Sequence, residues 1–365
     1  MSGNRSRHIA VVPGDGIGPE VIAEAVRVLR EADRRYELGL AFAEGLAGGA
    51  AIDATGDPIP EPTIALCRRS QAILLGACGG PKWDHGPRER RPEQALFTLR
   101  KTFGLYANLR PATVSPALLA ASPLRAEVVE GVDILIVREL TGGLYFGAQS
   151  RTGAGDEAAA MDTLPYSAGE VRRVVRKACQ IARARPRHKV TSVDKANVLE
   201  TSRLWREVAA EVAREFPDVT MEHMLVDNCA LQLVYNPQRF DVIVTDNMFG
   251  DILSDEAAGV VGSLGLMPSA SLGEQPPGLF EPVHGTAPDI AGRGLANPLA
   301  AILTGALLLR HGLGLEAPAA AIEAAVQQAL KDGQRTADLA GGRPTLGTAA
   351  MADAVLARFT SPAPT

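Results

Sequence analysis

The chain has 365 residues, of which 46% are hydrophobic, and a formal net charge of −5, which suits one large or two ordinary globular domains. Its lysines and arginines do not gather into the basic stripe that nucleic-acid binding needs, and no segment reaches the ~18 uncharged apolar residues of a membrane span. The four cysteines lie far apart and form no C-x-x-C pair. We therefore predict a cytoplasmic protein with reduced thiols that binds neither nucleic acid nor membrane.

Short β-branched runs alternate along the chain with longer amphipathic segments, which predicts an α/β fold. Proline at positions 19, 92 and 298 favours the first turn of a helix there, and Ser167 with Glu170 fits a capping box. The expected strands are residues 9–12, 72–75, 132–137, 189–193, 221–226 and 240–245, and the expected helices include residues 19–30 and 171–184.

Glycines follow the first expected strand, in the segment Gly14-Asp-Gly-Ile-Gly18. A dinucleotide-binding G-x-G-x-x-G fingerprint would require Gly or Ala at position 19, where this chain has Pro19. It would also require an acidic residue at the end of a second strand, and none stands at the expected distance. We therefore predict a tight turn that borders a site, and not a Rossmann phosphate loop.

A helix expected over residues 91–101 carries both charged and apolar side chains on one face, because Glu93, Leu96, Phe97 and Arg100 recur at helical spacing. One interpretation is that Leu96 and Phe97 belong to the core while the two charged residues pair outside it. The other is that this face lines a binding site.

Two further arginines favour the binding interpretation. Arg110 stands just before a proline, and Arg138 ends an apolar strand, where a buried charge usually has a function. Arginine binds carboxylates through two parallel hydrogen bonds. Arg100, Arg110 and Arg138 would therefore together suit a small dicarboxylic acid.

The segment Glu139–Gly147 differs from the regular elements around it. It contains a Gly142-Gly143 turn between extended stretches, and the polar residues 151–156 follow. We expect a hairpin or an arm in this region.

Two carboxylates, Asp251 and Asp255, stand four positions apart just after an apolar strand. On a helix they share one face, near the carboxyl end of the strand, where ligands of open α/β sheets bind. Such pairs are also common on solvated helix faces. A third carboxylate, Asp227, likewise ends an apolar run. Hard divalent cations prefer carboxylate oxygens, so the pattern favours a cation site.

Several motifs together resemble the isocitrate/isopropylmalate family of metal-dependent β-decarboxylating dehydrogenases. The similarity spans nearly the whole chain, and the combination of motifs is specific although each motif alone is weak. The motifs are Pro13–Glu20, Gly79–Asp84, Arg138–Gly147, Ser192–Val198, Asn247–Asp255 and Glu281–Ile290.

The resemblance implies an NAD-dependent oxidoreductase of leucine biosynthesis, the branched-chain amino-acid pathway, that acts on 3-isopropylmalate. Hydride would leave the carbon that bears the 2-hydroxyl, and the 3-carboxy-2-oxo acid would lose CO2 to give 4-methyl-2-oxopentanoate. Mg²⁺ or Mn²⁺, held by Asp227, Asp251 and Asp255, would polarise the substrate oxygen.

The resemblance also implies that Lys195 is the general base and that Tyr145 is the acid that reprotonates the enol. Lysine and tyrosine ordinarily keep their protons near pH 7, so these roles require an environment that changes their proton affinity. Taken alone, Lys195 could be a surface lysine and Tyr145 an arm residue that packs on a partner.

Substrate choice depends on the mixed face of the helix expected over residues 91–101. Leu96 and Phe97 offer apolar surface that suits an isopropyl group and would leave an extra carboxylate unpaired. The residues implied to contact the substrate are Glu93, Leu96, Phe97, Arg100, Arg110, Arg138 and Asp227.

Cofactor choice depends on Asp289. A carboxylate there can accept hydrogen bonds from the ribose hydroxyls of NAD and repels a 2′-phosphate, whereas NADP-using relatives carry Lys and Tyr in place of Asp289 and Ile290. Alternatively, Asp289 only caps a turn. The residues implied to bind NAD are Glu281, His284, Gly285, Ala287, Asp289 and Asn297.

The implied architecture is a two-domain, non-Rossmann α/β fold of the isopropylmalate/isocitrate dehydrogenase type with a protruding dimer arm. Residues 1–108 and 262–365 would form a first domain with most of the NAD-binding segment, and residues 109–261 a second domain with the arm and the dimer interface. The implied homodimer has shared active sites, to which the neighbouring subunit contributes Lys195 and Asp227. Two alternatives stay open: a relative that acts on tartrate, D-malate or homoisocitrate, and a catalytically silent regulatory or binding subunit.

Overall fold

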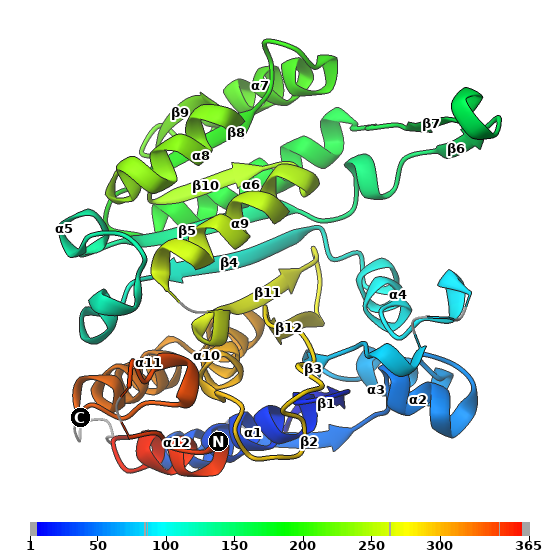
Figure 1. Ribbon diagram of the computed structural model, residues 1–365. Coiled ribbons are helices and arrows are strands. Elements are labelled where there is room, and N and C mark those ends of the chain that lie inside the picture. Colours follow the sequence, from blue (N-terminus) through cyan, green and yellow to red (C-terminus); the bar gives the residue numbers. More distant parts are fainter. Residues whose placement is uncertain (1–5, 84, 86, 263, 343, 360–365) are drawn as a thin grey trace. The chain divides into compact units, whose positions relative to one another are not determined.

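The computed structural model describes residues 6–83, 85, 87–262, 264–342 and 344–359, so Asp84, the last residue of one sequence motif, lies outside the described residues. The chain divides into two compact units. Unit 1 contains the described parts of Met1–Leu105, Ser115–Ala121 and Gly262–Thr365, and unit 2 contains Tyr106–Val114 and Ser122–Val261. Strands and helices alternate within both units, which confirms the predicted α/β class (Figure 1).

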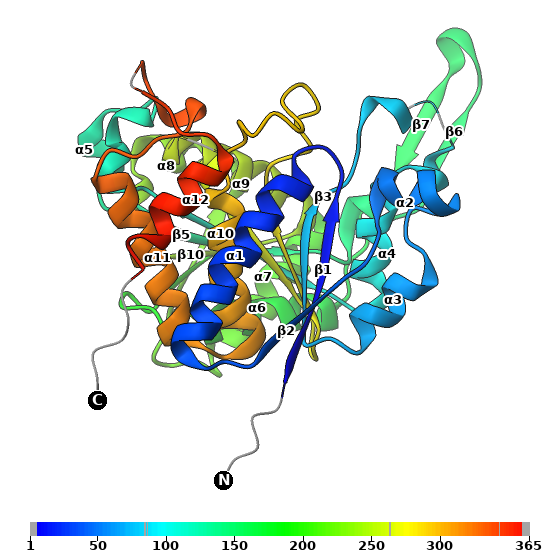
Figure 2. The ribbon, with the colours of Figure 1, turned by 90° about the horizontal axis from the view of Figure 1, so that it is seen from below.

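Unit 1 is built on strands in the order β2-β1-β3-β12-β11, in which only the β11–β12 pair of the described strands is antiparallel. Helices α1, α10, α11 and α12 pack together, on the opposite side of β1 and β3 from α2 and α3 (Figure 2). The elements are β1 (Arg7–Gly14), α1 (Gly18–Tyr36), β2 (Leu40–Glu44), α2 (Gly48–Thr55), α3 (Glu61–Arg68), β3 (Ala72–Ala77), α4 (Gln94–Thr102), β11 (Pro268–Leu272), β12 (Gly278–Pro282), α10 (Leu299–Leu307), α11 (Glu316–Lys331) and α12 (Thr348–Leu356).

Unit 2 is built on strands in the order β4-β5-β10-β8-β9, in which β4 and β5 are antiparallel and the other neighbours are parallel. Helix α6 packs on α7, and α8 packs on α9. The elements are β4 (Ala107–Thr113), α5 (Ala126–Val129), β5 (Asp133–Glu139), β6 (Gln149–Thr152), β7 (Ala159–Asp162), α6 (Ala168–Arg183), β8 (Lys189–Asp194), α7 (Glu200–Ala213), β9 (Thr220–Leu225), α8 (Val226–Tyr235), β10 (Val242–Thr245) and α9 (Asn247–Val261).

All the strands predicted from apolar runs are present, as β1, β3, β5, β8, β9 and β10. The capping box of α6 is also confirmed, because the Ser167 side chain accepts a hydrogen bond from the backbone of Glu170 and the Glu170 side chain accepts one from the backbone of Ser167. Pro19 lies in the first turn of α1, as predicted. The prediction was wrong for the other two prolines: Pro298 is the N-cap of α10, and Pro92 precedes the N-cap of α4.

The predicted hairpin is present, but it begins after the Gly142-Gly143 turn. Strands β6 and β7 pair in antiparallel fashion and extend away from the sheet of unit 2 (Figure 1). Gly143 has a φ of +77° and leads into a short 3₁₀ turn, Gly143–Tyr145. A Cβ atom on Gly143 would lie 2.5 Å from the Tyr166 hydroxyl oxygen, so glycine is required by close packing as well as by φ.

The described helices include none that is both long and apolar enough to cross a membrane. All four cysteines are free, and Cys67, Cys179 and Cys229 are buried. Burial raises the pKa of each of these three thiols to about 12. They are therefore protonated core residues at neutral pH.

Candidate active site

Helix α9 carries the two carboxylates of the predicted cation site. It follows β10 directly, and the side chains of Asp251 and Asp255 are 34% and 66% exposed. A Cβ atom on Gly250 would lie 2.7 Å from Cβ of Arg138, so only glycine lets α9 approach the end of β5 this closely. The backbone thus places Asp251 beside an arginine at the carboxyl end of a buried strand.

Two arginines converge on these carboxylates. Arg138, whose side chain is only 5% exposed, forms an ion pair with Asp251 and donates from Nε to Oδ1 of Asn247 at 2.9 Å. Nη1 of Arg110 lies 3.4 Å from Oδ1 of both Asp251 and Asp255, and it donates to Oγ of Ser254 at 2.7 Å. The acidic pair is therefore balanced by guanidinium groups that have the geometry to bind carboxylates.

Tyr145 completes this cluster. Its hydroxyl donates to Oδ2 of Asp251 at 3.0 Å, and the guanidinium of Arg138 lies 5.7 Å from the centre of its ring. Partial burial and the neighbouring Asp251 carboxylate raise the pKa of Tyr145 above its ordinary value. The side chain is nevertheless 44% exposed, so a bound molecule could reach the hydroxyl.

Lys195 and Asp227 form a separate pair within unit 2. Lys195 follows β8, Asp227 lies in the first turn of α8, and Nζ of Lys195 is 2.5 Å from Oδ1 of Asp227. The hydrogen bond from Lys195 lowers the pKa of Asp227. Within the described part of the chain, no three His, Cys, Asp or Glu side chains gather as metal ligands. One chain thus brings together Asp251 and Asp255, while Asp227 lies with Lys195.

In unit 1, the helix expected over residues 91–101 is α4, which carries Leu96, Phe97 and Arg100. Nη2 of Arg100 donates to Oε1 of Glu281 at 3.0 Å, and Nε of Arg100 is buried and has no partner among the described residues. Glu93 is the N-cap of α4. Leu96 packs partly against the core of unit 1, as the structural alternative proposed, whereas Phe97 is 40% exposed.

The segment proposed to bind NAD follows β12. Nε2 of His284 is buried without a hydrogen-bond partner among the described residues, and Nδ1 lies 3.0 Å from the carbonyl oxygen of Gly285. Burial lowers the pKa of His284, so the ring is neutral at pH 7. Asp289 is exposed, and Ala287 has a positive φ of 38°. An unpaired buried ring nitrogen beside exposed polar turns fits a nucleotide ligand.

Asn297 has two partners within unit 1. Its Nδ2 donates to Oδ2 of Asp338 at 2.9 Å, and its Oδ1 accepts from the backbone N–H of Leu299 at 3.0 Å. The Asn297 side chain therefore holds the start of α10 against the turn that carries Asp338.

The glycine-rich turn after β1 supports this segment in a way that sequence reasoning missed. The Asp15 carboxylate is buried and accepts hydrogen bonds from the backbone N–H groups of Gly49, Ala50 and Gly79 at 2.7, 2.8 and 2.9 Å. A Cβ atom on Gly16 would lie 2.1 Å from the carbonyl oxygen of Thr286. The predicted tight turn therefore packs directly on the proposed cofactor segment. The closely spaced glycines of this turn were the one feature of the sequence that could have indicated such close packing.

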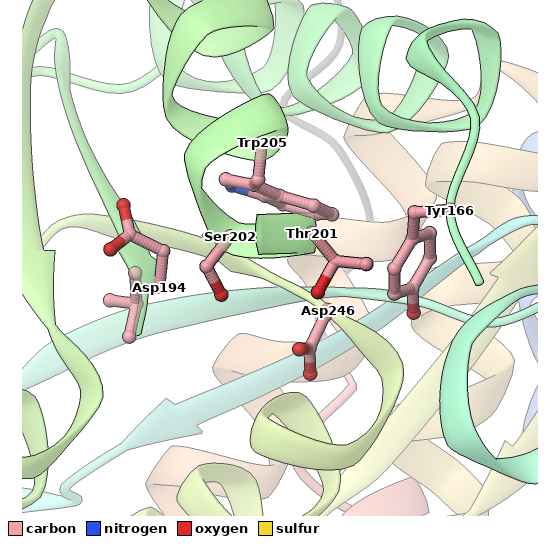
Figure 3. Close-up of a pocket in the computed structure, with 7 residues that line it drawn as sticks. Tyr166, Asp194, Thr201, Ser202, Trp205 and Asp246 are labelled. Carbon is pink, nitrogen blue, oxygen red and sulfur yellow. The ribbon is translucent and has the colours of Figure 1, made fainter. Parts of the chain in front are cut away.

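A narrow polar pocket in unit 2 was also not predicted. It leaves no room for a water-sized molecule. Figure 3 shows the hydroxyls of Tyr166 and Ser202 and the carboxylate of Asp246 around it. Burial raises the pKa of Asp246 to about 7. The lining residues are Tyr166, Val193, Asp194, Thr201, Ser202, Trp205 and Asp246.

Comparisons with known proteins agree with these features. The profile of the family described as isocitrate/isopropylmalate dehydrogenase matches residues 8–355. The 3-isopropylmalate dehydrogenase of Priestia megaterium is 57% identical over 353 residues, which cover 96% of this chain and 95% of that protein. That of Geobacillus kaustophilus is 60% identical over 338 residues, 92% of this chain and 91% of that protein.

A solved structure is also similar over nearly the whole chain. The crystal structure of isocitrate dehydrogenase from Methylococcus capsulatus has a TM-score of 0.85 and 39% sequence identity, and the match covers 97% of this chain and 99% of that one. The fold and the sequence therefore define a dehydrogenase-type α/β protein. The chain belongs to the isocitrate/isopropylmalate dehydrogenase family, which confirms the resemblance.

Proposed function

We propose that this protein is an NAD- and divalent-metal-dependent dehydrogenase that converts 3-isopropylmalate into 4-methyl-2-oxopentanoate and CO2 in leucine biosynthesis. The relatives named above for this activity are 57% and 60% identical to the chain, which supports the assignment. The observation that carries it is the Asp251 carboxylate, which is bonded at once by Arg138 and by the Tyr145 hydroxyl.

The arginines bind the carboxylates of the substrate. Arg110 and Arg138 have the required charge and fork geometry, and Arg100 offers a buried Nε that no described residue bonds. Glu93 borders the same face of α4. The exposed Phe97 and the half-buried Leu96 supply apolar surface for the isopropyl group, which favours 3-isopropylmalate over a substrate with a further carboxylate.

The donor set fits a divalent cation. Asp251 and Asp255 present oxygen atoms from one solvent-accessible face of α9, and Asp227 is an exposed carboxylate at the start of α8. Mg²⁺ or Mn²⁺, when bound by these three residues, would polarise the oxygen at the reacting carbon.

The proton transfers fall to Lys195 and Tyr145. NAD, when bound, would supply the acceptor for the hydride of C2. Lys195, in its neutral form, takes the proton of the 2-hydroxyl, and the neighbouring Asp227 carboxylate stabilises the ammonium group that forms. The bond between C3 and its carboxylate group then breaks, CO2 leaves, and the electron pair of that bond passes to the C2 oxygen as an enolate. Tyr145 donates a proton to C3, and its hydrogen bond to Asp251 orients the hydroxyl for that step.

NAD binding falls to the segment after β12. Nε2 of His284, which has no partner within the described part of the chain, is available to the adenine ring, and the exposed Asp289 to the ribose hydroxyls. Glu281, Gly285, Ala287 and Asn297 complete the proposed set. Asn297 acts by fixing the start of α10, since its side chain is bonded to Asp338 and to the backbone of Leu299.

We further propose a homodimer with shared active sites. The apolar side chains of Leu231, Val234 and Tyr235 on α8 and of Ile252 on α9 are exposed on two helices that contact each other, which suits a subunit interface. Lys195 and Asp227 of one subunit would act with Tyr145, Asp251 and Asp255 of the other. The functional division at residues 108/109 and 261/262 and a cytoplasmic location stay predictions.

A substrate panel tests the reaction. NADH formation is measured with 3-isopropylmalate, isocitrate, D-malate and tartrate. We expect kcat/KM to be highest for 3-isopropylmalate by about 10-fold or more, the usual discrimination of an apolar pocket. A preference for isocitrate or for unsubstituted malate would contradict the assignment.

Mixed dimers test the sharing of sites. Lys195→Ala and Asp251→Ala chains are each inactive in this scheme. When they are unfolded and refolded together, a heterodimer has one site in which both residues are intact, so activity returns. Failure of the mixture to recover activity, with dimers demonstrated by sedimentation, would refute the shared site.

A further inference from the structure

Asn247 connects three parts of the proposed catalytic cluster. Its Oδ1 accepts a hydrogen bond from Nε of Arg138 at 2.9 Å, and its Nδ2 donates to the carbonyl oxygen of Gly142 at 3.1 Å. Its backbone opens α9, one turn before Asp251. The residue is 1% exposed. One buried amide therefore joins the substrate arginine, the turn that leads to Tyr145 and the helix that carries the carboxylates.

Tyr166 holds Asn247 from the other side. Its hydroxyl accepts a hydrogen bond from the backbone N–H of Asn247 at 3.0 Å and donates to Oε2 of Glu139 at 3.4 Å. Its ring fills the space over the glycine turn, where a Cβ atom on Gly142 would lie 2.7 Å from the ring. It also packs edge-on against Trp205, with ring centres 6.0 Å apart. Figure 3 shows Tyr166 beside Asp246, the residue before Asn247.

Glu139 fixes the same turn through its own carboxylate. It is fully buried and accepts hydrogen bonds from the backbone N–H groups of Thr141, at 3.0 Å, and Gly142, at 2.8 Å. The N–H of Gly143 donates to the carbonyl oxygen of Pro165 at 3.1 Å, so the residue before Tyr166 bonds the turn as well. The contacts form a continuous chain from Glu139 through Tyr166 to Asn247.

We propose that Tyr166 and Asn247 are positioning residues, which hold the Tyr145 turn, Arg138 and the first turn of α9 in one fixed arrangement. This inference rests on the proposed function of Tyr145 and Asp251. Neither Tyr166 nor Asn247 transfers a proton. Their hydrogen bonds keep the Tyr145 hydroxyl against Asp251. A displacement of a catalytic group by about 1 Å costs on the order of 100-fold in rate.

Tyr166→Phe tests the proposal, because it removes the hydroxyl and keeps the ring against Gly142 and Trp205. We expect kcat with 3-isopropylmalate to fall about 10–100-fold, while KM changes by less than about 3-fold, because Arg138 keeps its bond to Asn247. The matched control is Tyr36→Phe on α1. This change also removes a tyrosine hydroxyl, but the Tyr36 ring packs on Phe359 and not on Gly142 or Trp205. It should retain wild-type kcat.

Hydrogen exchange gives a readout that does not depend on activity. Peptides that cover residues 139–147 and 245–251 should exchange faster in Tyr166→Phe than in wild type, and the rest of the chain should be unchanged. A wild-type enzyme that is inactive with 3-isopropylmalate would refute the proposed function, while this measurement would still decide the positioning. Wild-type exchange in both peptides, or a kcat within 2-fold of wild type, would overturn the proposal.

Asn247→Asp provides a second variant should Tyr166→Phe fail to fold. Aspartate keeps an acceptor for Arg138 but cannot donate to the carbonyl oxygen of Gly142. The proposal predicts a kcat loss of about 10-fold or more and faster exchange in residues 139–147. A folded Asn247→Asp enzyme with wild-type kcat and exchange would overturn it.

Discussion

The α9 cluster, made of Arg110, Arg138, Tyr145, Asp251 and Asp255, differs from the segment after β12 in how its polar groups are bonded. At α9, the reactive side chains are bonded to one another: Asp251 contacts Arg138, Arg110 and Tyr145. In the segment after β12, the buried Nε2 of His284 lacks a partner among the described residues, and Asp289 faces solvent. The difference indicates that the acid–base groups are preorganised by the fold, whereas the cofactor segment offers atoms that a ligand completes.

Removal of the Tyr145 hydroxyl should cause the largest loss of activity among the changes in the α9 cluster. Tyr145→Phe keeps the ring over Arg138 but loses the proposed acid, so we expect kcat to fall about 10²–10⁴-fold, the usual contribution of a general acid. Steady-state kinetics check this, with Tyr36→Phe as the matched control. A kcat within 3-fold of wild type would remove Tyr145 from the mechanism.

The pKa of Asp246 makes the stability around α9 depend on pH. Burial raises this pKa from 3.8 to about 7, so the folded protein binds a proton that the unfolded chain has released between these pH values. The stabilisation is complete below about pH 4 and is lost as pH rises through about 7.

Asp246→Asn keeps an oxygen that can accept from the backbone N–H of Phe249 and removes the titration. Relative to wild type, the free energy of unfolding of the variant should therefore be about 2–3 kcal/mol higher at pH 8 than at pH 5. Urea unfolding at the two pH values measures this difference. An equal difference at both values would show that Asp246 is ionised in the folded protein.

Reversal of the charge at position 289 tests whether the segment after β12 selects NAD over NADP. Asp289→Lys should lower the ratio of kcat/KM with NAD to kcat/KM with NADP about 10–100-fold, because lysine attracts the 2′-phosphate that aspartate repels. Asp289→Asn should give an intermediate ratio. An unchanged ratio in both variants would mean that Asp289 only caps a turn.

Helix α9 contains one glycine in a tightly packed position, Gly250, and one in an open position, Gly259. Gly250→Ala places a methyl group 2.7 Å from Arg138, whereas a Cβ atom on Gly259 meets nothing within 4 Å. We expect Gly250→Ala to lower the free energy of unfolding by about 1–3 kcal/mol through overpacking. Gly259→Ala should raise it by about 0.5–1 kcal/mol. Urea unfolding of both variants checks the contrast, and equal effects would contradict the close approach of α9.

The sequence predicted elements whose apolar residues are continuous. The fully buried β3 and the strands β5, β8 and β10 lie where apolar runs predicted them. Strand β4 was not predicted because it contains Arg110 and Pro111, and β2 is a short, half-buried strand with a weak pattern. Their pairing with neighbouring strands, which local patterns do not encode, decides their structure.

The site was predictable to the extent that residues are close in sequence. The spacing of Asp251 and Asp255 correctly predicted one helical face on α9. The contacts of Tyr166 with Glu139 and Asn247 join positions far apart in the chain, and no spacing rule predicts them. The pairing of Asp227 with Lys195 likewise depends on the neighbouring ends of β8 and β9, which the register of the sheet determines.

Metal dependence is the most direct test of the proposed chemistry. The wild-type enzyme is treated with EDTA, and NADH formation from 3-isopropylmalate is followed before and after addition of Mg²⁺ or Mn²⁺, alongside Asp255→Asn. We predict that chelation abolishes the activity, that either cation restores it, and that Asp255→Asn requires a higher cation concentration for half-maximal rate. Full activity of the wild-type enzyme in EDTA would contradict the assignment of Asp227, Asp251 and Asp255 to a catalytic cation.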